Sequence, residues 1–200
     1  MKRILTIAAL AFATLTVSAQ DDDYKFTVKA GVGLAHVVGA DADTRVNIAA
    51  KAGISYDLNL YKGLYVIPEI DFALKGYNPS PNNLYYTNAV FMTYLQMPIM
   101  FAYKFKVNNG GNIVVKAGPY FACGLFGSKS TVSNWSYSKR VDVFDSDYGY
   151  KRFDVGINAG IGFERNHMSV EFEYSRGLNK LYPAFALYNQ AFLINLGYRF

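Results

Sequence analysis

Residues 26–34 read FTVKAGVGL, in which apolar side chains alternate with small or polar ones. A period of two places successive side chains on opposite faces of a β-strand, whereas a helix repeats its apolar positions every 3.6 residues. The same alternation returns in seven later segments, so the sequence predicts an all-β chain of eight strands. The expected strands are 26–34, 46–58, 64–74, 95–105, 113–123, 153–163, 168–174 and 192–200.

The two faces of these expected strands differ in chemistry. One face carries apolar residues and no charge, and the opposite face carries glycines together with charges of both signs. The charged residues predicted on that second face are Lys29, Lys51, Glu69, Asp71, Lys75, Lys104, Lys116, Arg152, Asp154, Glu164, Glu171, Glu173 and Arg199, with Lys25 and Asp57 at strand ends.

Alternation alone fits either a soluble barrel with its polar face outward or a membrane barrel with its apolar face outward. Glycines on the polar face favour the membrane barrel, because the lumen of a small barrel is narrow. Aromatic residues gather at both ends of the apolar stripes, as they do at the two interfaces of a bilayer. The final strand also runs to an aromatic residue, Phe200. We therefore expect an eight-stranded antiparallel up-and-down transmembrane β-barrel.

The composition excludes several other classes. The 200 residues are 52% hydrophobic and only 18% charged, so disorder is excluded. Cys123 is the single cysteine, which excludes a disulfide scaffold. Beyond the first 20 residues no apolar run reaches the roughly 18 residues that a membrane helix needs. The net charge of +5 is too small and too dispersed to predict a nucleic-acid partner.

The first residues have the pattern of a secretory signal peptide. A basic start, Met1-Lys2-Arg3, precedes the apolar segment 4–17, and small residues follow at the expected cleavage point after Ala19. We therefore expect residues 1–19 to be removed and residues 20–200 to form the barrel domain.

The expected connections alternate between short and long. Residues 59–63, 106–111 and 165–167 are short turns, whereas 35–45, 76–93, 124–151 and 175–191 are long. In outer-membrane barrels the short turns are periplasmic and the long loops are extracellular. Pro68, Pro98 and Pro119 lack a backbone N–H, so bulges or weakened pairing are expected there.

Short segments spread over most of the chain resemble the small outer-membrane β-barrel proteins, a family also called the porin family or the outer membrane protein β-barrel domain. The matching segments are 29–34 (KAGVGL), 67–69 (IPE), 94–98 (YLQMP), 116–119 (KAGP), 153–156 (FDVG) and 196–200 (LGYRF). Gln96 departs from the family, which often has Glu at that position. The resemblance implies an outer-membrane location and a C-terminal strand whose Tyr198 and Phe200 are read by the barrel-insertion machinery.

The charged face has two interpretations, a conducting pore or a lumen plugged by ion pairs. Eight strands enclose a space that side chains can fill, and buried charges are tolerable only when paired. The nearly equal numbers of acids and bases therefore favour the plug.

A catalytic or metal site is not expected. His167, Ser169 and Glu171 share one face of a strand and resemble, in residue type, the site of outer-membrane lipid A deacylases. Alternate residues on one strand lie about 7 Å apart, too far for direct hydrogen bonds. His36, Asp41 and Asp43 do not make a recognisable metal set. No enzyme activity and no cofactor are predicted.

The long loops are the expected place for a specific role. Exposed aromatic and charged residues there suit an interaction surface, formed by Tyr85, Tyr86, Trp135, Tyr137, Arg140, Phe144 and Tyr148. The alternative is a loop that packs on itself and caps the barrel, and the sequence leaves both open.

The sequence thus predicts a monomeric structural or cell-surface interaction protein of the outer membrane. Its predicted partners are membrane lipid, the insertion machinery and an extracellular ligand or protein. A small passive channel is the alternative, and a lipid-modifying enzyme the remote one.

Overall fold

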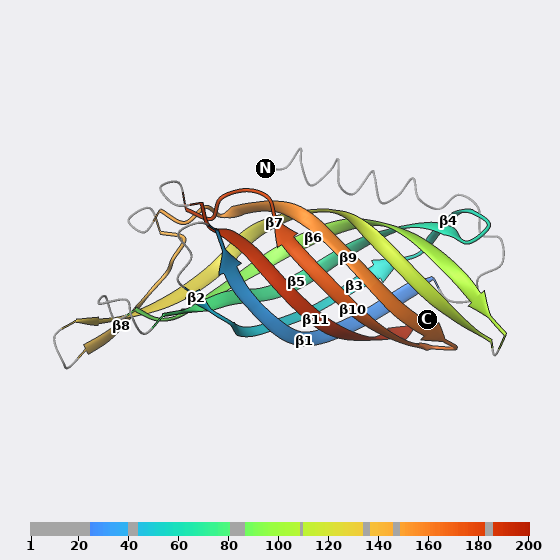
Figure 1. The fold of residues 1–200 in the computed structure, drawn as a ribbon, viewed down its shortest axis with the longest axis horizontal. Helices are drawn as coiled ribbons and strands as arrows, with labels where there is room; N and C mark the ends of the chain where they lie inside the picture. Colours follow the sequence, from blue (N-terminus) through green and yellow to red (C-terminus); the bar gives the residue numbers. More distant parts are fainter. Residues whose placement is uncertain are drawn as a thin grey trace.

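The sheet of this protein closes on itself through its first and last strands. β1 (Phe26–Val38) pairs with β11 (Tyr188–Arg199) on one side and with β3 (Asn47–Tyr56) on the other, as the ribbon in Figure 1 shows. The structure is a computed structural model, and it describes residues 25–39, 44–80, 87–108, 110–133, 137–145, 149–182 and 186–200. The predicted signal peptide lies outside the described residues.

The other strands follow one another around the barrel, and every pairing between them is antiparallel. They are β2 (Thr44–Arg45), β4 (Leu58–Tyr61), β5 (Leu64–Pro79), β6 (Thr87–Val107), β7 (Gly111–Ser133), β8 (Tyr137–Val141), β9 (Phe153–Arg165) and β10 (Met168–Gly177). β2, β3 and β4 together make one wall strand, and β8 pairs only with the outer end of β7, so the wall has the eight strands that the alternation predicted.

The apolar face of the wall points outward. Val32 is 67% exposed, Ile194 57% and Phe172 48%, whereas the alternating residues Lys29 and Lys51 are buried at 5% and 4%. This arrangement is the reverse of a soluble protein and confirms the membrane barrel. No helix among the described residues is long and apolar enough to cross a bilayer.

Outward aromatic residues gather in two belts, one at each end of the barrel. The belt near the short turns contains Phe26, Tyr56, Tyr103, Phe105, Phe163, Tyr198 and Phe200, and the belt near the loops contains Phe72, Phe121, Phe153, Tyr174 and Phe192. Neighbouring rings pack on each other, with centroids 4.9 Å apart for Tyr198 and Phe200 and 5.0 Å apart for Tyr174 and Phe192. Such belts lie at the two interfaces of the bilayer.

Parts of two long connections, residues 76–79 with 87–93 and residues 124–133, are extensions of the strands, although the sequence predicts loops there. β6 is 21 residues long and β7 is 23, so both continue far beyond the outer aromatic belt, toward β8 at the left of Figure 1. Glycines and polar residues in 76–93 and 124–133 obscure the alternation there. Pairing the two segments satisfies their backbone groups, which explains why they remain extended.

The three prolines interrupt the ladders without shifting them. β5 and β6 pair at Pro68–Ile99 and again at Asp71–Gln96 in the same register, and no pairing forms between these two points, where Pro98 lies. The ladder between β6 and β7 is interrupted in the same way beside Pro119, and β3 gives way to β4 at Asp57, opposite the Pro68 region. Pairing is weakened as predicted, but the bulges between β6 and β7 lie elsewhere, near Val90 and Thr93.

A charge on the outward face should be costly in proportion to its depth. Ile194 lies between the two aromatic residues Phe192 and Tyr198 on β11, so Ile194→Arg should lower the free energy of unfolding by about 2–4 kcal/mol. Urea titration of the barrel in phospholipid vesicles measures this change. Tyr61→Arg, at an exposed turn position, should cost about 0–1 kcal/mol, and equal losses at the two sites would contradict the outward assignment.

Candidate functional site

Charged side chains from every wall strand point into the lumen and fill it. Six basic and seven acidic residues of the described chain form ion pairs there. They divide into three groups along the barrel, which we name the turn-end, central and loop-end groups. The loop-end group lies beneath an apolar cap.

The turn-end group contains Asp57, Lys104, Glu164 and Arg199. Lys104 binds the carboxylate of Asp57 and also that of Glu164, at 2.9 Å. Arg199 contacts the same two acids at 3.4 Å and 3.1 Å. Two bases and two acids therefore neutralise each other, and each acid contacts both bases.

The central group contains Lys29, Lys51, Lys116, Glu69, Asp71, Glu171 and Glu173. Glu69 is the hub, because Lys29 binds one of its oxygens and Lys116 binds the other at 2.8 Å. Lys116 also binds Glu171 at 2.8 Å, and Lys51 binds Glu173.

The central group has one more carboxylate than ammonium groups, and Asp71 is the acid held least tightly. It is fully buried, yet its oxygens accept no hydrogen bond from the described residues. Its nearest ammonium groups are those of Lys51 at 3.4 Å and Lys29 at 3.8 Å.

The loop-end group joins Lys75 and Asp154 through aromatic and amide side chains. The two charges are 3.9 Å apart, and the Lys75 ammonium lies 4.4 Å from the centroid of the Tyr120 ring. Tyr120 and Asn189 donate hydrogen bonds to the Asp154 carboxylate at 3.0 Å and 2.9 Å. This group is therefore neutral and closely packed.

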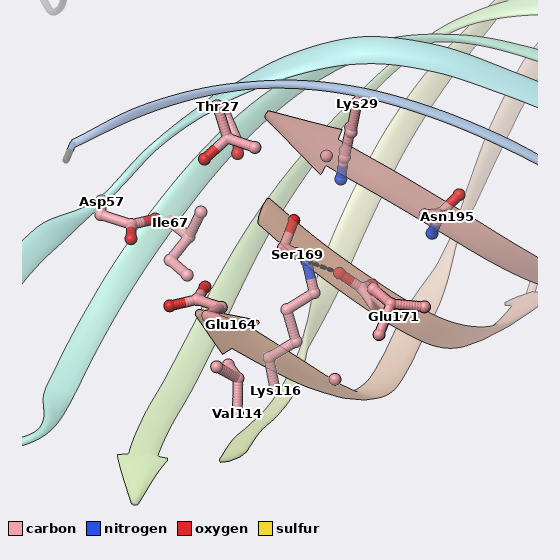
Figure 2. A pocket seen from close by; sticks show the side chains of 14 residues that line it. Thr27, Lys29, Asp57, Ile67, Val114, Lys116, Glu164, Ser169, Glu171 and Asn195 are labelled. Carbon is pink, nitrogen blue, oxygen red and sulfur yellow. Dashed lines mark ion pairs between the residues drawn. The ribbon is translucent and has the colours of Figure 1, made fainter. Parts of the chain in front are cut away.

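Little space remains among these side chains. The cavity between the turn-end and central groups has a volume of about 30 Å³, enough for about two water molecules. Figure 2 shows its lining, in which Lys116 and Glu171 point toward each other. A wider hollow of about 830 Å³ lies outside the ion pairs, at the turn end, between the tips of the strands.

Apolar residues close the lumen at the loop end. Val143, Phe144 and Leu181 come from loops and fold inward onto Tyr94 and Tyr120, and each of the five is at most 5% exposed. We call this cluster, with Val37, Val90, Met92 and Ala122, the cap. Val143 and Phe144 belong to the third long connection, so part of that connection packs on the barrel itself.

Two glycines of β7 leave room for the cap. A side chain at Gly124 would meet the Phe144 ring, and one at Gly127 would meet Val143. The Asp142 carboxylate accepts hydrogen bonds from the backbone of Gly127 and Phe144, at 3.2 Å and 3.0 Å, which fastens the loop to β7.

A tyrosine pair joins the outer part of β5 to the third loop. The hydroxyl oxygens of Tyr77 and Tyr150 are 2.5 Å apart. Burial raises the pKa of both phenols, so both stay neutral at physiological pH and one donates to the other.

Twelve of the thirteen charges predicted in the lumen lie inside the barrel, and Arg152 does not. β9 begins at Phe153, so the alternation does not extend to Arg152, which is exposed. Its guanidinium lies 5.5 Å from the centroid of the Phe144 ring and donates to the Gly124 carbonyl at 3.4 Å. Arg152 therefore covers the cap from outside.

The predicted loop surface is only partly described. Phe144 is buried in the cap, so its assignment to an exposed surface is wrong. Tyr85, Tyr86, Trp135 and Tyr148 lie outside the described residues, and of Tyr137 and Arg140 only the backbone, in β8, is described. Tyr94 and Asn189 were missed because the expected strands begin too late, at residues 95 and 192, whereas β6 and β11 include both residues. Tyr120 lies on the luminal face of the expected strand 113–123, but the predicted luminal residues were charged ones only.

Two of the three residues with catalytic side-chain types, His167 and Glu171, have other partners. The His167 ring bonds the Arg199 carbonyl at 2.9 Å and stacks on Tyr198, and Glu171 pairs with Lys116. Among the described residues, no group of three or more His, Cys, Asp or Glu side chains could hold a metal ion.

The chain matches the family described as "Outer membrane protein beta-barrel domain" over residues 18–182. No curated protein matches it. Among solved structures it resembles Neisserial surface protein A (NspA), at 10% identity and a TM-score of 0.53, covering 88% of this chain and 97% of that one. It also resembles the outer membrane enzyme PagL, at 13% identity and a TM-score of 0.55, covering 87% and 99%. At these identities the likeness establishes the fold alone.

Glu69 and Asp71, two of the buried acids of the central group, should respond differently to neutralisation. Glu69→Gln leaves the Lys29 ammonium without its main partner and leaves Lys116 with Glu171 alone, so it should lower the free energy of unfolding by about 3 kcal/mol. Asp71→Asn removes the charge in excess and should cost less than about 1 kcal/mol. Urea titration in vesicles compares the two, and a larger loss for Asp71→Asn would contradict this description of the group.

Proposed function

We propose, from the premise that the chain belongs to the family of the outer membrane protein β-barrel domain, that it is a closed, non-conducting barrel which acts at the cell surface through its outer strands. The chain is an outer-membrane β-barrel protein with transmembrane strands. The specific role of the protein is what we propose, and the main observation that supports it is that side chains fill the lumen.

The lumen offers no continuous path for a hydrated solute. An ion entering from the turn end meets the Lys104–Asp57 and Arg199–Glu164 pairs, then the central group, and finally the cap. Opening this path would separate buried ion pairs, which is strongly unfavourable. These contacts support a structural barrel over the small passive channel.

The outer strands supply a surface where a partner can bind. β2 pairs with the end of β5, and β8 pairs with the end of β7 from Lys129 to Ser133. We name the outer ends of β5, β6 and β7, together with β2 and β8, the outer sheet. Its strand β8 carries Tyr137 and Arg140, residue types that are enriched at binding hot spots.

A lipid-modifying enzyme is the less supported alternative. PagL is an outer membrane enzyme with a similar fold, so the fold itself does not decide the question. In this chain the His167 ring and the Glu171 carboxylate already bind other groups, which argues against a catalytic arrangement with Ser169.

Because the lumen is closed, we expect the barrel not to conduct ions. The purified barrel in planar bilayers should give no conductance steps above the lipid baseline. The double variant Val143→Ser, Phe144→Ser loosens the cap and should stay silent, because the ion pairs below remain. Stable steps from the unmodified barrel would overturn the proposal, and steps from the variant alone would make the cap the only barrier.

Removing the tip of the outer sheet should abolish surface binding and leave the barrel intact. Lys129 and Val141 are directly paired, so residues 130–140 can be replaced by the two-residue turn Asn-Gly. Cells displaying the full barrel should adhere to some members of an array of immobilised glycans and matrix proteins, and cells displaying the shortened barrel should not.

Folding of both forms is verified by their heat-modifiable mobility in gels. A Gly-Ser insertion after Gly110, at the turn end, is the matched control and should adhere like the full barrel. Equal adherence of the shortened form, or no adherence of the full barrel, would count against the surface role.

A further inference from the structure

We propose that the hollow at the turn end is a binding site for a carboxylate-rich peptide segment, and that its occupant is Asp21-Asp22-Asp23 of the same chain. The three aspartates lie outside the described residues. The hollow, the charges around it and the position of Lys25 support the assignment. The inference concerns the end of the barrel opposite the outer sheet and does not depend on the proposed surface role.

The hollow is the open mouth of the barrel at the turn end. It has a volume of about 830 Å³ and is lined by residues near the ends of β4, β5, β6, β7, β9 and β11, together with turn residues such as Lys62 and Asn166. Pockets that hold ligands commonly measure about 300–1,000 Å³. The mouth therefore has room for several side chains of a peptide segment.

The floor of the hollow is electrically neutral. Lys104 and Arg199 line it, and both contact the carboxylates of Asp57 and Glu164 in the turn-end group. These two bases and two acids neutralise one another, so any excess charge at the mouth comes from other side chains.

The rim of the hollow carries an excess of positive charge. Lys62 and Lys106 line it, both are exposed, and neither forms an ion pair with another described residue. The Lys62 ammonium lies 6.0 Å from the centroid of the Tyr61 ring, a contact that does not neutralise its charge. In the described segments 56–66, 102–108, 110–112, 163–167 and 196–200 the acidic side chains are Asp57 and Glu164, and both belong to the floor. Two ammonium groups at the mouth therefore have no counter-charge among the described residues.

Amide side chains beside these lysines add donors that suit a carboxylate. Asn59, Asn112 and Asn166 also line the hollow, and Asn112 pairs in register with Lys106. Each amide has two N–H donors, and hydrogen bonds to an ionised carboxylate are stronger than those between neutral groups. The mouth thus combines ammonium and amide donors, which is the chemistry that binds carboxylates.

Lys25, the first described residue, lies at the edge of this hollow. Its backbone N–H donates to the Phe200 oxygen at 3.0 Å, and its carbonyl accepts a hydrogen bond from the Asp57 N–H at 2.8 Å. The Asp57 carboxylate in turn binds Lys104 in the floor. In the sequence, Asp21-Asp22-Asp23 is separated from Lys25 by Tyr24 alone. Three carboxylates are therefore attached directly to the rim.

The length of this attachment matches the width of the mouth. An extended chain covers about 3.3–3.6 Å per residue, so Asp21 can lie up to about 14 Å from Lys25. Around the wall, β5 and β6 follow β1 and the strand made by β3 and β4. Neighbouring strands are about 4.8 Å apart, which places the ends of β5 and β6, with Lys62 and Lys106, about 10–15 Å from β1.

The attachment also raises the strength of binding. Single exposed ion pairs are weak, because water and salt screen them. A short tether holds the carboxylates near the lysines at an effective concentration on the order of millimolar, so several weak contacts can form together. The chain would thereby close the turn end of its own barrel.

The test is carbodiimide coupling of the folded full chain in detergent, followed by mass spectrometry of its peptides. The reagent joins a carboxylate to an amine only when the two are in contact. Coupling should link the peptide that contains Asp21, Asp22 and Asp23 to Lys62 and to Lys106. In about 1 M NaCl, where the Debye length is about 3 Å, the yield should fall at least about fivefold.

The variant Lys62→Gln distinguishes binding from mere proximity. Loss of one ammonium weakens the bound state, so the coupling yield at Lys106 should fall about three- to fivefold. A segment that only passes near the mouth would couple to Lys106 with an unchanged yield. Lys151→Gln, at an exposed position of the loop end, is the matched control and should leave the yield at Lys106 unchanged. The proposal is wrong if Lys62→Gln has no effect, or if neither lysine is coupled in the unmodified barrel.

A synthetic peptide of residues 20–24 identifies the occupant. The triple variant Asp21→Asn, Asp22→Asn, Asp23→Asn vacates the hollow, so the added peptide should couple to Lys62 and Lys106 at least about fivefold more in this variant than in the unmodified barrel. Equal coupling to the two forms would mean that the segment does not occupy the site, and this result, or no coupling to the variant, would overturn the proposal. Heat-modifiable mobility verifies that every variant is folded.

Discussion

Backbone N–H and C=O groups cannot remain unpaired in hydrocarbon, and this constraint governs the whole molecule. It requires the pairing of β1 with β11, which leaves the sheet without an edge inside the bilayer. Once the sheet is closed, its pleat divides every strand into a face toward lipid and a face toward the lumen. Lys29 and Val32 are on opposite faces for this reason alone.

Closure at eight strands then dictates what the lumen contains. The interior of an eight-stranded barrel is just wide enough for side chains to fill. Charges fill it because each long side chain reaches a partner on another strand, as Lys51 reaches Glu173. Glu69 forms ion pairs with two lysines at once, whereas the Asp71 oxygens accept no hydrogen bond from the described residues. The ion-pair network is therefore held most tightly at Glu69 and least tightly at Asp71.

The sequence predicted the parts of the structure that repeat with a period of two. Strand positions, the outward face, both aromatic belts and most of the luminal charges follow from that period and from the chemistry of a bilayer. Arg152 was misplaced because the period stops at Phe153, where the strand begins. Phe144 and Leu181 could not have been assigned to the cap, because loop residues have no periodic signal and their burial depends on contacts with distant strands.

The length of β7 sets how far the protein rises above the membrane. From Phe121 in the outer aromatic belt to Ser133, the strand covers about 40 Å, which a tilt of about 40° reduces to roughly 30 Å of height. Lipid headgroups and the sugars attached to them crowd the space next to the bilayer. A paired, stiff sheet carries its tip through that layer, so an antibody or another large molecule can reach the tip without first displacing lipid.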